Sequence, residues 1–303
     1  MSTKIASHSS GRQLFSSKIA ATVVWTITIL WTIPTLGLFI TSFRTGEAIY
    51  ASGWWSAFSH PAFTLQNYKD VFLGGASESL SDGVLPYFVN SIVITLPATI
   101  FPVIIATMAA YGLAWVKFKG ADFLFFSIFA LQIVPLQMSL VPLLQLFTGG
   151  AHIGNTTIFP ALGIAGKFAG IWVPHTMFAL PLAIYLLHNF IASLPKELME
   201  AAYVDGANHF YIFRKIVIPL SVPGIAALAI FQFLWVWNDY FIAFMFVGNH
   251  TVMTYKLLSM LGQHGEGWQI VMAGCLVSVL VPLTVFFSLQ RYFVRGLTAG
   301  SVK

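Results

Sequence analysis

The chain has 303 residues, of which 57% are hydrophobic and only 8% are charged, and its mean hydropathy is +0.81. A soluble domain carries about 25% charged residues, so this chain cannot cover a globule of its size with a solvated surface, and lipid is expected to be its main solvent. The net charge of +5 would suit nucleic acid, but the basic residues flank apolar runs instead of forming a patch. With one cysteine, Cys275, a disulfide framework is excluded.

Six segments are apolar over the roughly 20 residues that a helix needs to cross a bilayer. They are residues 19–42, 89–115, 123–147, 168–190, 221–246 and 268–289. Several contain proline, which membrane helices tolerate because neighbouring groups bind the freed backbone atoms. The sequence therefore predicts an all-α membrane protein with six transmembrane helices over residues 19–293, between an N-terminal tail (1–18) and a C-terminal tail (294–303).

The basic residues also predict an orientation. If the N-terminus is cytoplasmic, most Lys and Arg residues fall in cytoplasmic loops and tails, as the positive-inside rule requires. Both termini are then cytoplasmic, the long loop at 44–88 is external, and the loop between the fourth and fifth spans faces the cytoplasm.

That fourth-to-fifth loop gathers charge in an otherwise apolar chain. Its apolar residues Leu194, Leu198, Ala201 and Ala202 follow the i, i+4, i+7, i+8 spacing of one helix face. Asp205-Gly206 then predicts a sharp turn, because glycine readily adopts the positive φ of a helix end.

A second periodic stretch follows the turn at Phe210, Phe213, Ile216 and Val217, and Pro219 is expected to end it. One interpretation is a pair of helices lying among lipid headgroups. The other is a helix that presents small residues to a protein cleft. The second is favoured because anionic lipid would not attract the acids of the first helix.

In this loop the chain resembles the permease subunits of bacterial ATP-binding-cassette (ABC) importers. Their EAA loop has the form E-A-A-x-x-D-G-A, followed by an apolar run and a proline. It stands here as the continuous sequence Glu200-Ala201-Ala202-Tyr203-Val204-Asp205-Gly206-Ala207, closed by Ile216-Val217-Ile218-Pro219.

Further motifs are similar to those of the carbohydrate branch, in particular the second, shorter permease of maltose-type importers. They are Thr41-Ser42-Phe43-Arg44, Asn67-Tyr68, Asn90-Ser91, Ala110-Tyr111-Gly112-Leu113-Ala114, Leu194-Pro195-Lys196-Glu197-Leu198, Trp237-Asn238-Asp239-Tyr240 and the tail from Gln290 to Lys303. The resemblance covers nearly the whole chain, with a core region at about 85–290.

The resemblance implies a type I importer fold in the bacterial inner membrane and a mechanism. A coupling helix would sit in a cleft of a cytoplasmic ATPase dimer, with Glu200 paired to a base, and ATPase closure would drive alternating access. The implied coupling residues are Glu200, Ala201, Ala202, Asp205, Gly206, Ala207 and Pro219. The implied partners are a second permease, the ATPase dimer, an extracytoplasmic sugar-binding protein and the bilayer, with no nucleic acid.

No catalytic or cofactor role is expected of this chain. It contains no G-x-x-x-x-G-K-[ST] loop, and the nearest run, residues 161–168, lacks the first glycine and the hydroxyl residue that cradle phosphate. ATP and Mg²⁺ are therefore expected on the partner ATPase. No His, Cys, Asp or Glu group has metal-ligand spacing.

Asp239 is the acid placed well inside a predicted span, which makes it a functional candidate. Trp237, Asn238, Asp239 and Tyr240 together offer the aromatic and polar groups that sugar recognition uses, although bonding between helices explains Asp239 equally well. His175 is interpreted as interhelical hydrogen bonding and His209 as a solvent or interface residue.

The predicted function is the permease of an ATP-driven sugar importer, with an oligosaccharide or α-glucoside as substrate. The alternatives are an importer of another solute and a secondary transporter, which has no need of a docking helix for an ATPase. A membrane-embedded enzyme would need paired acids or histidines at the membrane face, and the helix pattern of the loop explains most of the candidates.

Overall fold

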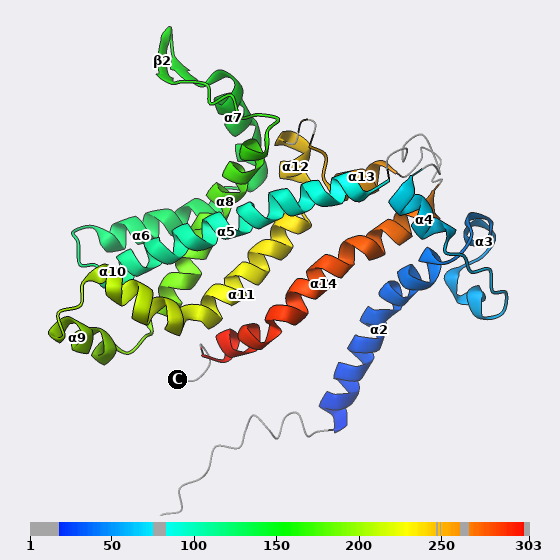
Figure 1. The fold of residues 1–303 in the computed structure, drawn as a ribbon, viewed down its shortest axis with the longest axis horizontal. Helices are drawn as coiled ribbons and strands as arrows, with labels where there is room; N and C mark the ends of the chain where they lie inside the picture. The colour runs from blue at the N-terminus through cyan, green and yellow to red at the C-terminus, as the bar shows by residue number, and fades with distance from the viewer. Residues whose placement is uncertain (1–17, 75–82, 247, 249, 261–266, 300–303) are drawn as a thin grey trace, which may run out of the picture.

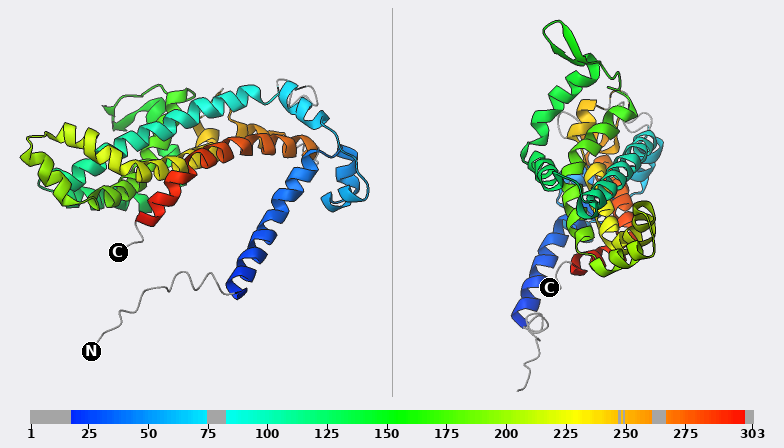
Figure 2. Two further views of the ribbon diagram at one scale, coloured as in Figure 1. Left: turned by 60° about the horizontal axis from the view of Figure 1, so that its bottom comes forward. Right: turned by 90° about the vertical axis from the view of Figure 1, so that its left-hand side faces the viewer.

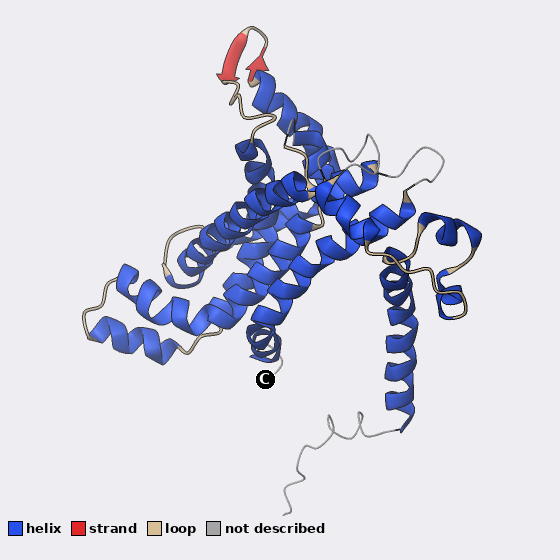
Figure 3. Cartoon of the chain, turned by 45° about the vertical axis from the view of Figure 1, so that its right-hand side comes forward, coloured by secondary structure: helices blue, strands red, loops and turns tan. Residues whose placement is uncertain are grey.

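In the computed structural model the chain is almost wholly helical (Figure 3). The structure describes residues 18–74, 83–246, 248, 250–260 and 267–299. Of the predicted N-terminal tail (1–18) only Lys18 is described, whereas residues 294–299 of the predicted C-terminal tail (294–303) are described and continue the last helix. The helices in chain order are α2 (Lys18–Ser42), α3 (Gly46–Ala51), the 3₁₀ helix η1 (Trp54–Phe58), α4 (Gln66–Leu73), α5 (Leu85–Trp115), α6 (Ala121–Ala130), the 3₁₀ turn η3 (Leu131–Ile133), α7 (Leu136–Gly149), α8 (Phe168–Ala192), α9 (Lys196–Val204), α10 (His209–Ile212), the π-helical turn η4 (Phe213–Val217), α11 (Ile218–Trp237), α12 (Phe241–Phe246), α13 (Met253–Ser259) and α14 (Trp268–Ala299).

Five helical segments of the described chain are long and apolar enough to cross a membrane. They are Lys18–Ser42, Leu85–Trp115, Phe168–Ala192, His209–Trp237 and Trp268–Gln290. The segments α6–η3 and α7 are bent by 100° relative to each other. If they are counted together as one broken span, the chain has a sixth. The structure therefore supports a mostly helical membrane protein with five or six candidate spans.

The long helices form an elongated bundle in which α11 lies between α5 and α14 (Figure 1). Helix α8 packs along α5 and also contacts α11. Helices α9 and α10 extend from one end of the bundle, and α3, α4 and α13 lie at the other. Helix α2 contacts α14 and η1 and then diverges from the bundle, as both views in Figure 2 show.

Two buried clusters join α5, α8 and α11. One lies towards the α9–α10 end and combines residues of α5, α8 and α11 with Met199 and Ala202 of α9. The other surrounds Ile171, Val236 and Phe246 and joins α5, α7, α8, α11 and α12. These clusters fix the two regions where the sequence places its candidate functional residues.

The third predicted span, residues 123–147, is not one helix. Val134 is extended (ψ 119°) and Pro135 follows it before α7 begins. A residue before proline is pushed out of the helical region by the proline ring, and here that constraint outweighs the tolerance of membrane helices for proline. The bend turns α7 away from α6, so that α7 packs on α8 and α12 and leads to a hairpin of β1 (Ala151–Ile153) and β2 (Thr156–Phe159) (Figure 1).

The fifth predicted span, residues 221–246, also differs from the structure. Helix α11 ends at Trp237 and α12 begins at Phe241, so residues 238–240 interrupt the helix. At the other end, Pro219 was expected to end a helix, but α10, η4 and α11 continue through it. The π-helical turn explains this, because the Ile218 amide donates to the Phe213 carbonyl five residues back and the ladder shifts register just before the proline.

The first loop folds around one arginine. Arg44 is buried, and its guanidinium donates to the carbonyls of Ala48 and Ser52 at 2.7 and 3.0 Å. Asn67 of α4 donates to the carbonyls of Ser42 and Arg44, both at 2.8 Å. This segment therefore closes the end of the bundle opposite α9 as a folded unit.

Leu187→Ala should lower the free energy of unfolding by about 2–5 kcal/mol, because the smaller side chain leaves a cavity and loses packing contacts with its neighbours. Lipid solvates a leucine side chain as well as the protein interior does, so the loss is one of packing. Leu187 is 1% exposed in the cluster near α9, whereas Leu182 on the same helix is 44% exposed, so Leu182→Ala is the matched control. Equilibrium unfolding in detergent measures both. Equal losses would contradict the packing described for α8.

Candidate functional site

Helix α9 carries the acids of the charged loop on an exposed surface. It begins after Pro195, whose extended conformation (φ −57°, ψ 127°) ends the connection from α8, and Glu197 occupies its first turn. Glu200 and Ala201 are exposed. Val204, at the end of the helix, is 87% exposed although it is apolar.

The buried face of α9 is not the one that the sequence pattern indicated. Met199 and Ala202 pack into the bundle, while Leu198 and Ala201 face outward. Ala202 and the partly buried Ala207 therefore anchor the helix instead of being presented to a partner. Met199, one position beyond Leu198, joins the buried cluster that α5 and α8 form.

The turn after α9 has the geometry predicted for Asp205-Gly206. Gly206 has φ +78°, and its amide donates to the Tyr203 carbonyl at 3.0 Å. The next amide, of Ala207, donates to the Ala202 carbonyl at 2.9 Å. These two bonds form a Schellman motif, which requires the left-handed conformation that glycine supplies. Asn208 then caps α10 by accepting from the Tyr211 amide at 2.8 Å.

Side chains from three elements hold this loop to the bundle. The hydroxyl of Tyr111, near the end of α5, lies 2.9 Å from Nδ1 of His209, and the hydroxyl of Tyr203 lies 3.1 Å from the same atom. Close by, the indole of Trp115 donates to the Ile191 carbonyl of α8 at 3.1 Å. His209 is thus a loop-anchoring residue that sequence reasoning missed, because its tyrosine on α5 is remote in the chain.

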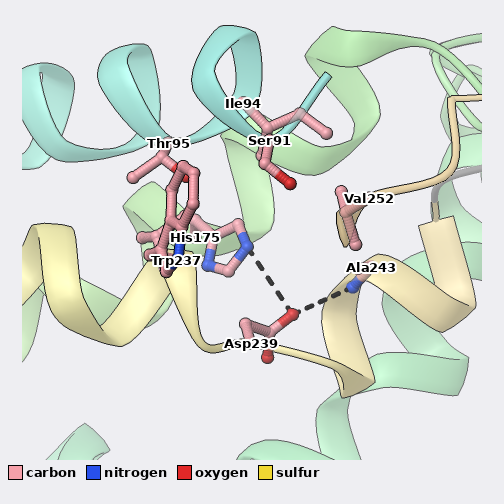
Figure 4. Close-up of a pocket in the computed structure, with 9 residues that line it drawn as sticks. Ser91, Ile94, Thr95, His175, Trp237, Asp239, Ala243 and Val252 are labelled. Carbon is pink, nitrogen blue, oxygen red and sulfur yellow. Dashed lines mark hydrogen bonds and ion pairs between the residues drawn. The ribbon is translucent and has the colours of Figure 1, made fainter. Parts of the chain in front are cut away.

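At the break in the fifth span, Asp239 organises the polypeptide (Figure 4). Its Oδ2 accepts from the Ala243 amide at 3.0 Å, at the start of α12. Its carbonyl accepts from the Thr254 hydroxyl at 2.8 Å. Nε2 of His175, on α8, lies 3.8 Å from Oδ2. The carboxylate therefore ties α12 to α11 and lies next to α8.

Asp239 separates two spaces. On one side is an internal cavity of about 10 Å³, lined by Ser91, Ile94, Thr95, His175, Val236, Trp237, Asp239, Ala243 and Val252. On the other side is an open groove of about 480 Å³, lined by Phe231, Leu234, Trp235, Asn238, Asp239, Tyr240 and Phe241. His175 is 2% exposed, and its Nδ1 has no hydrogen-bond partner among the described residues.

The structure divides the predicted pathway residues between these spaces. Asn238 and Tyr240 line the groove with Asp239, and the ring of Tyr240 stacks on Tyr255 with centroids 6.0 Å apart. Trp237 is 3% exposed and packs edge-to-face on Phe88, so it does not line the groove. The exposed Trp235 lines the groove in place of Trp237. The helical period of 3.6 residues indicates this, because it places Trp235 on the same face of α11 as Asn238.

Within the described residues no group of three or more His, Cys, Asp or Glu side chains is placed to hold a metal ion. The polar clusters instead serve helix ends and helix contacts. They leave an exposed helix at one end of the bundle and a groove beside a helix break further along it.

Comparisons with known proteins agree with this architecture. Residues 102–299 match the family described as the binding-protein-dependent transport system inner membrane component. The fold superposes with a TM-score of 0.69 on a chain of a bacterial ABC transporter involved in import of the acidic polysaccharide alginate, over 96% of this chain and 100% of that one. At 20% identity this likeness shows the fold alone. The chain belongs to the binding-protein-dependent transport system inner membrane component family.

Similar proteins indicate which solutes the relatives of this chain transport. An osmoprotective compounds uptake permease protein of Synechocystis sp. is 46% identical over 92% of this chain and 90% of its own length. An alpha-glucoside transport system permease protein of Rhizobium meliloti is 48% identical over 82% of this chain, which spans 62% of that protein. A trehalose/maltose transport system permease protein of Thermococcus litoralis is 32% identical over 79% of this chain and 81% of its own length.

The chain is therefore a multi-pass permease subunit of an ABC importer, in the group that transports sugars and oligosaccharides. It is a transport component and not an enzyme, and the ATPase is a separate subunit. Membership in this family excludes the alternative of a secondary transporter.

Gly206→Ala should loosen α9, because the left-handed conformation costs a residue with a Cβ about 1–2 kcal/mol. No atom lies within 4 Å of the added carbon, so the effect is conformational and not steric. Hydrogen exchange of residues 196–204 measures the loss of protection. Gly112→Ala is the control, since Gly112 also has free space but lies within the helix α5. Unchanged exchange in Gly206→Ala would contradict the role of the Schellman turn.

Proposed function

We propose that this chain forms half of the translocation pathway of an ATP-driven importer and that α9 is its coupling helix. The observation that supports this most directly is the mounting of α9. The helix is fixed to the bundle through Met199 and Ala202, while Glu200, Ala201 and Val204 project from the end of the molecule.

The exposed surface of α9 suits a protein cleft. Val204, one turn after Glu200 on the helix, and Phe210, across the loop, expose apolar side chains. Apolar groups around a single charge that pairs with an opposite charge on the partner are typical of the centre of an interface, where the charge pair selects the partner. In this proposal Glu200 pairs with a basic residue of the ATPase, and Asp205 and Gly206 set the angle at which α9 is presented.

The orientation follows from this docking. The α9–α10 end of the bundle faces the cytoplasm, both termini are cytoplasmic, and the protein lies in the bacterial inner membrane. The ATPase dimer binds ATP and Mg²⁺ and closes beneath α9. An extracytoplasmic binding protein delivers the solute at the opposite end, and a second, homologous permease completes the pathway.

The groove at the helix break is the proposed contribution of this chain to the pathway. Asn238 is exposed there, next to Asp239 and Tyr240, at the interruption that follows the apolar helix α11. Its side-chain amide donates to the Leu234 carbonyl at 2.9 Å, and an exposed polar side chain inside a span rarely faces lipid, because hydrocarbon offers it no further partners. An aqueous pathway resolves this, and the rings of Trp235 and Tyr240 beside Asn238 offer the stacking and hydrogen-bonding groups that a sugar uses.

An α-glucoside or a related small oligosaccharide is the proposed substrate. The alpha-glucoside and trehalose/maltose permeases named above support it. An osmoprotective compound is the second candidate, favoured by the 46% identity to the Synechocystis permease over nearly the whole chain.

Glu200→Lys should reduce ATP-dependent uptake by about tenfold or more, because a reversed charge meets a basic partner and like charges at an interface cost several kcal/mol. Uptake of labelled maltose, sucrose and trehalose by cells that express the whole importer measures this. Glu197→Lys is the matched control, as Glu197 is an exposed acid in the first turn of the same helix. Equal effects of the two substitutions, or none, would contradict docking through Glu200.

Asn238→Cys should react with a charged, membrane-impermeant thiol reagent, because the groove is proposed to be wet. The single native cysteine makes Cys275→Ala a cysteine-free background. Leu280→Cys serves as the control, since Leu280 is exposed on the apolar helix α14 and is expected to face lipid or protein. Labelling at 280 but not at 238 would place the groove against lipid and refute the pathway.

A further inference from the structure

Three side chains from three elements meet at one ring nitrogen, at the junction of α9 with the bundle. Tyr111 belongs to α5, Tyr203 to α9, and His209 is the first residue of α10. Both tyrosine hydroxyls approach Nδ1 of His209, at 2.9 Å and 3.1 Å, and both rings pack edge-on against the imidazole. We call these three residues the tyrosine–histidine latch.

The two tyrosines of the latch are not bound equally to His209. A neutral imidazole nitrogen without a proton has one lone pair, so it accepts one good hydrogen bond. Tyr111 has a second acceptor in the His209 carbonyl, 3.3 Å from its hydroxyl. Tyr203 is 42% exposed, and its hydroxyl can bind water or the Tyr111 hydroxyl, with which it also interacts, instead. The bond from Tyr203 to His209 can therefore break and re-form while Tyr111 stays bound to His209.

Tyr111 of the latch lies on the same helix as two residues that line the cavity beside Asp239. Tyr111 is buried, and its ring packs on Phe213 of the π-helical turn with centroids 5.1 Å apart. Helix α5 then continues to Ser91 and Thr95, which line that cavity, with Pro97 and Pro102 in the intervening turns. About 20 residues separate the two sites, which is ~30 Å of helix at 1.5 Å per residue.

By contrast, few constraints hold the tip of α9. The Gly206 turn has no neighbouring atom within 4 Å of an added Cβ, and the residues on its outer face are exposed. A force on α9 reaches the bundle through Met199 and Ala202, which pack laterally, and through the directional bonds of the latch.

We propose that His209 is a positioning residue that transmits movement of α9 to α5 through Tyr203 and Tyr111. The inference rests on the proposed coupling function and adds a defined route within this chain. Docking of the ATPase sets α9, His209 carries its position to Tyr111, and α5 carries it to the cavity and groove at the helix break.

The test uses the complete importer in lipid nanodiscs, with and without a non-hydrolysable ATP analogue, and follows hydrogen exchange at α9 and at residues 85–95 of α5. His209→Leu removes the acceptor, and His209→Asn restores a polar atom near the position of Nδ1. Tyr203→Phe removes one hydroxyl and keeps the ring. Tyr185→Phe is the control, because the Tyr185 ring stacks on Phe129 outside the latch.

In the parent and in His209→Asn, the analogue should change exchange at both segments. In His209→Leu the response at α9 should persist while that at residues 85–95 falls by about threefold to tenfold, as loss of a typical hydrogen bond implies. Tyr203→Phe should act in the same direction, and Tyr185→Phe should behave as the parent.

Two results would overturn the inference and are distinguishable. If α9 of the parent does not respond to the analogue, the coupling function itself fails. If α9 responds and residues 85–95 respond equally in parent, His209→Leu and Tyr203→Phe, the coupling function stands and the latch does not transmit. If His209→Leu lowers the yield of the complex, Tyr203→Phe still tests the inference, because it removes one hydroxyl and retains every packed ring.

Discussion

Backbone amides and carbonyls inside a bilayer must form their hydrogen bonds within the protein. The architecture of this permease depends on how these groups are hydrogen-bonded where its helices are interrupted. An unpaired amide or carbonyl in hydrocarbon costs several kcal/mol. At the interruption after α11, the Asp239 carboxylate accepts from the Ala243 amide and the Thr254 hydroxyl donates to the Asp239 carbonyl. Before Pro219 a π-helical turn shifts the ladder so that the helix continues.

These satisfied interruptions give the bundle its functional features. The break after Trp237 separates an internal cavity from an open groove and places Asn238 and Tyr240 at the groove. The bend before Pro135 turns α7 away from α6, so that α7 packs on α8 and α12. Helix α5, continuous from Leu85 to Trp115 although it contains Pro97 and Pro102, reaches both the cavity and the mounting of α9, so the two sites share one helix.

Local sequence signals predicted much of this and missed what depends on distant contacts. Apolar runs indicated the spans because a membrane helix satisfies its own backbone, and Asp205-Gly206 indicated the left-handed turn. The break at Pro135 was missed although the proline signal was present, since it competed with the tolerance of membrane helices for proline. The β1–β2 hairpin was also missed, although Gly154-Asn155 between its strands is a recognised turn pair. The buried face of α9, the approach of His175 to Asp239 and the Tyr111–His209 contact depend on helix packing that no local pattern encodes.

The most direct test of the account is solute uptake by the purified importer, with its ATPase and binding protein, reconstituted in proteoliposomes. The account predicts that labelled maltose, sucrose or trehalose accumulates only when ATP is on the ATPase side and the loaded binding protein is on the opposite side, without any ion gradient. Accumulation driven by a proton or sodium gradient in the absence of ATP would contradict it.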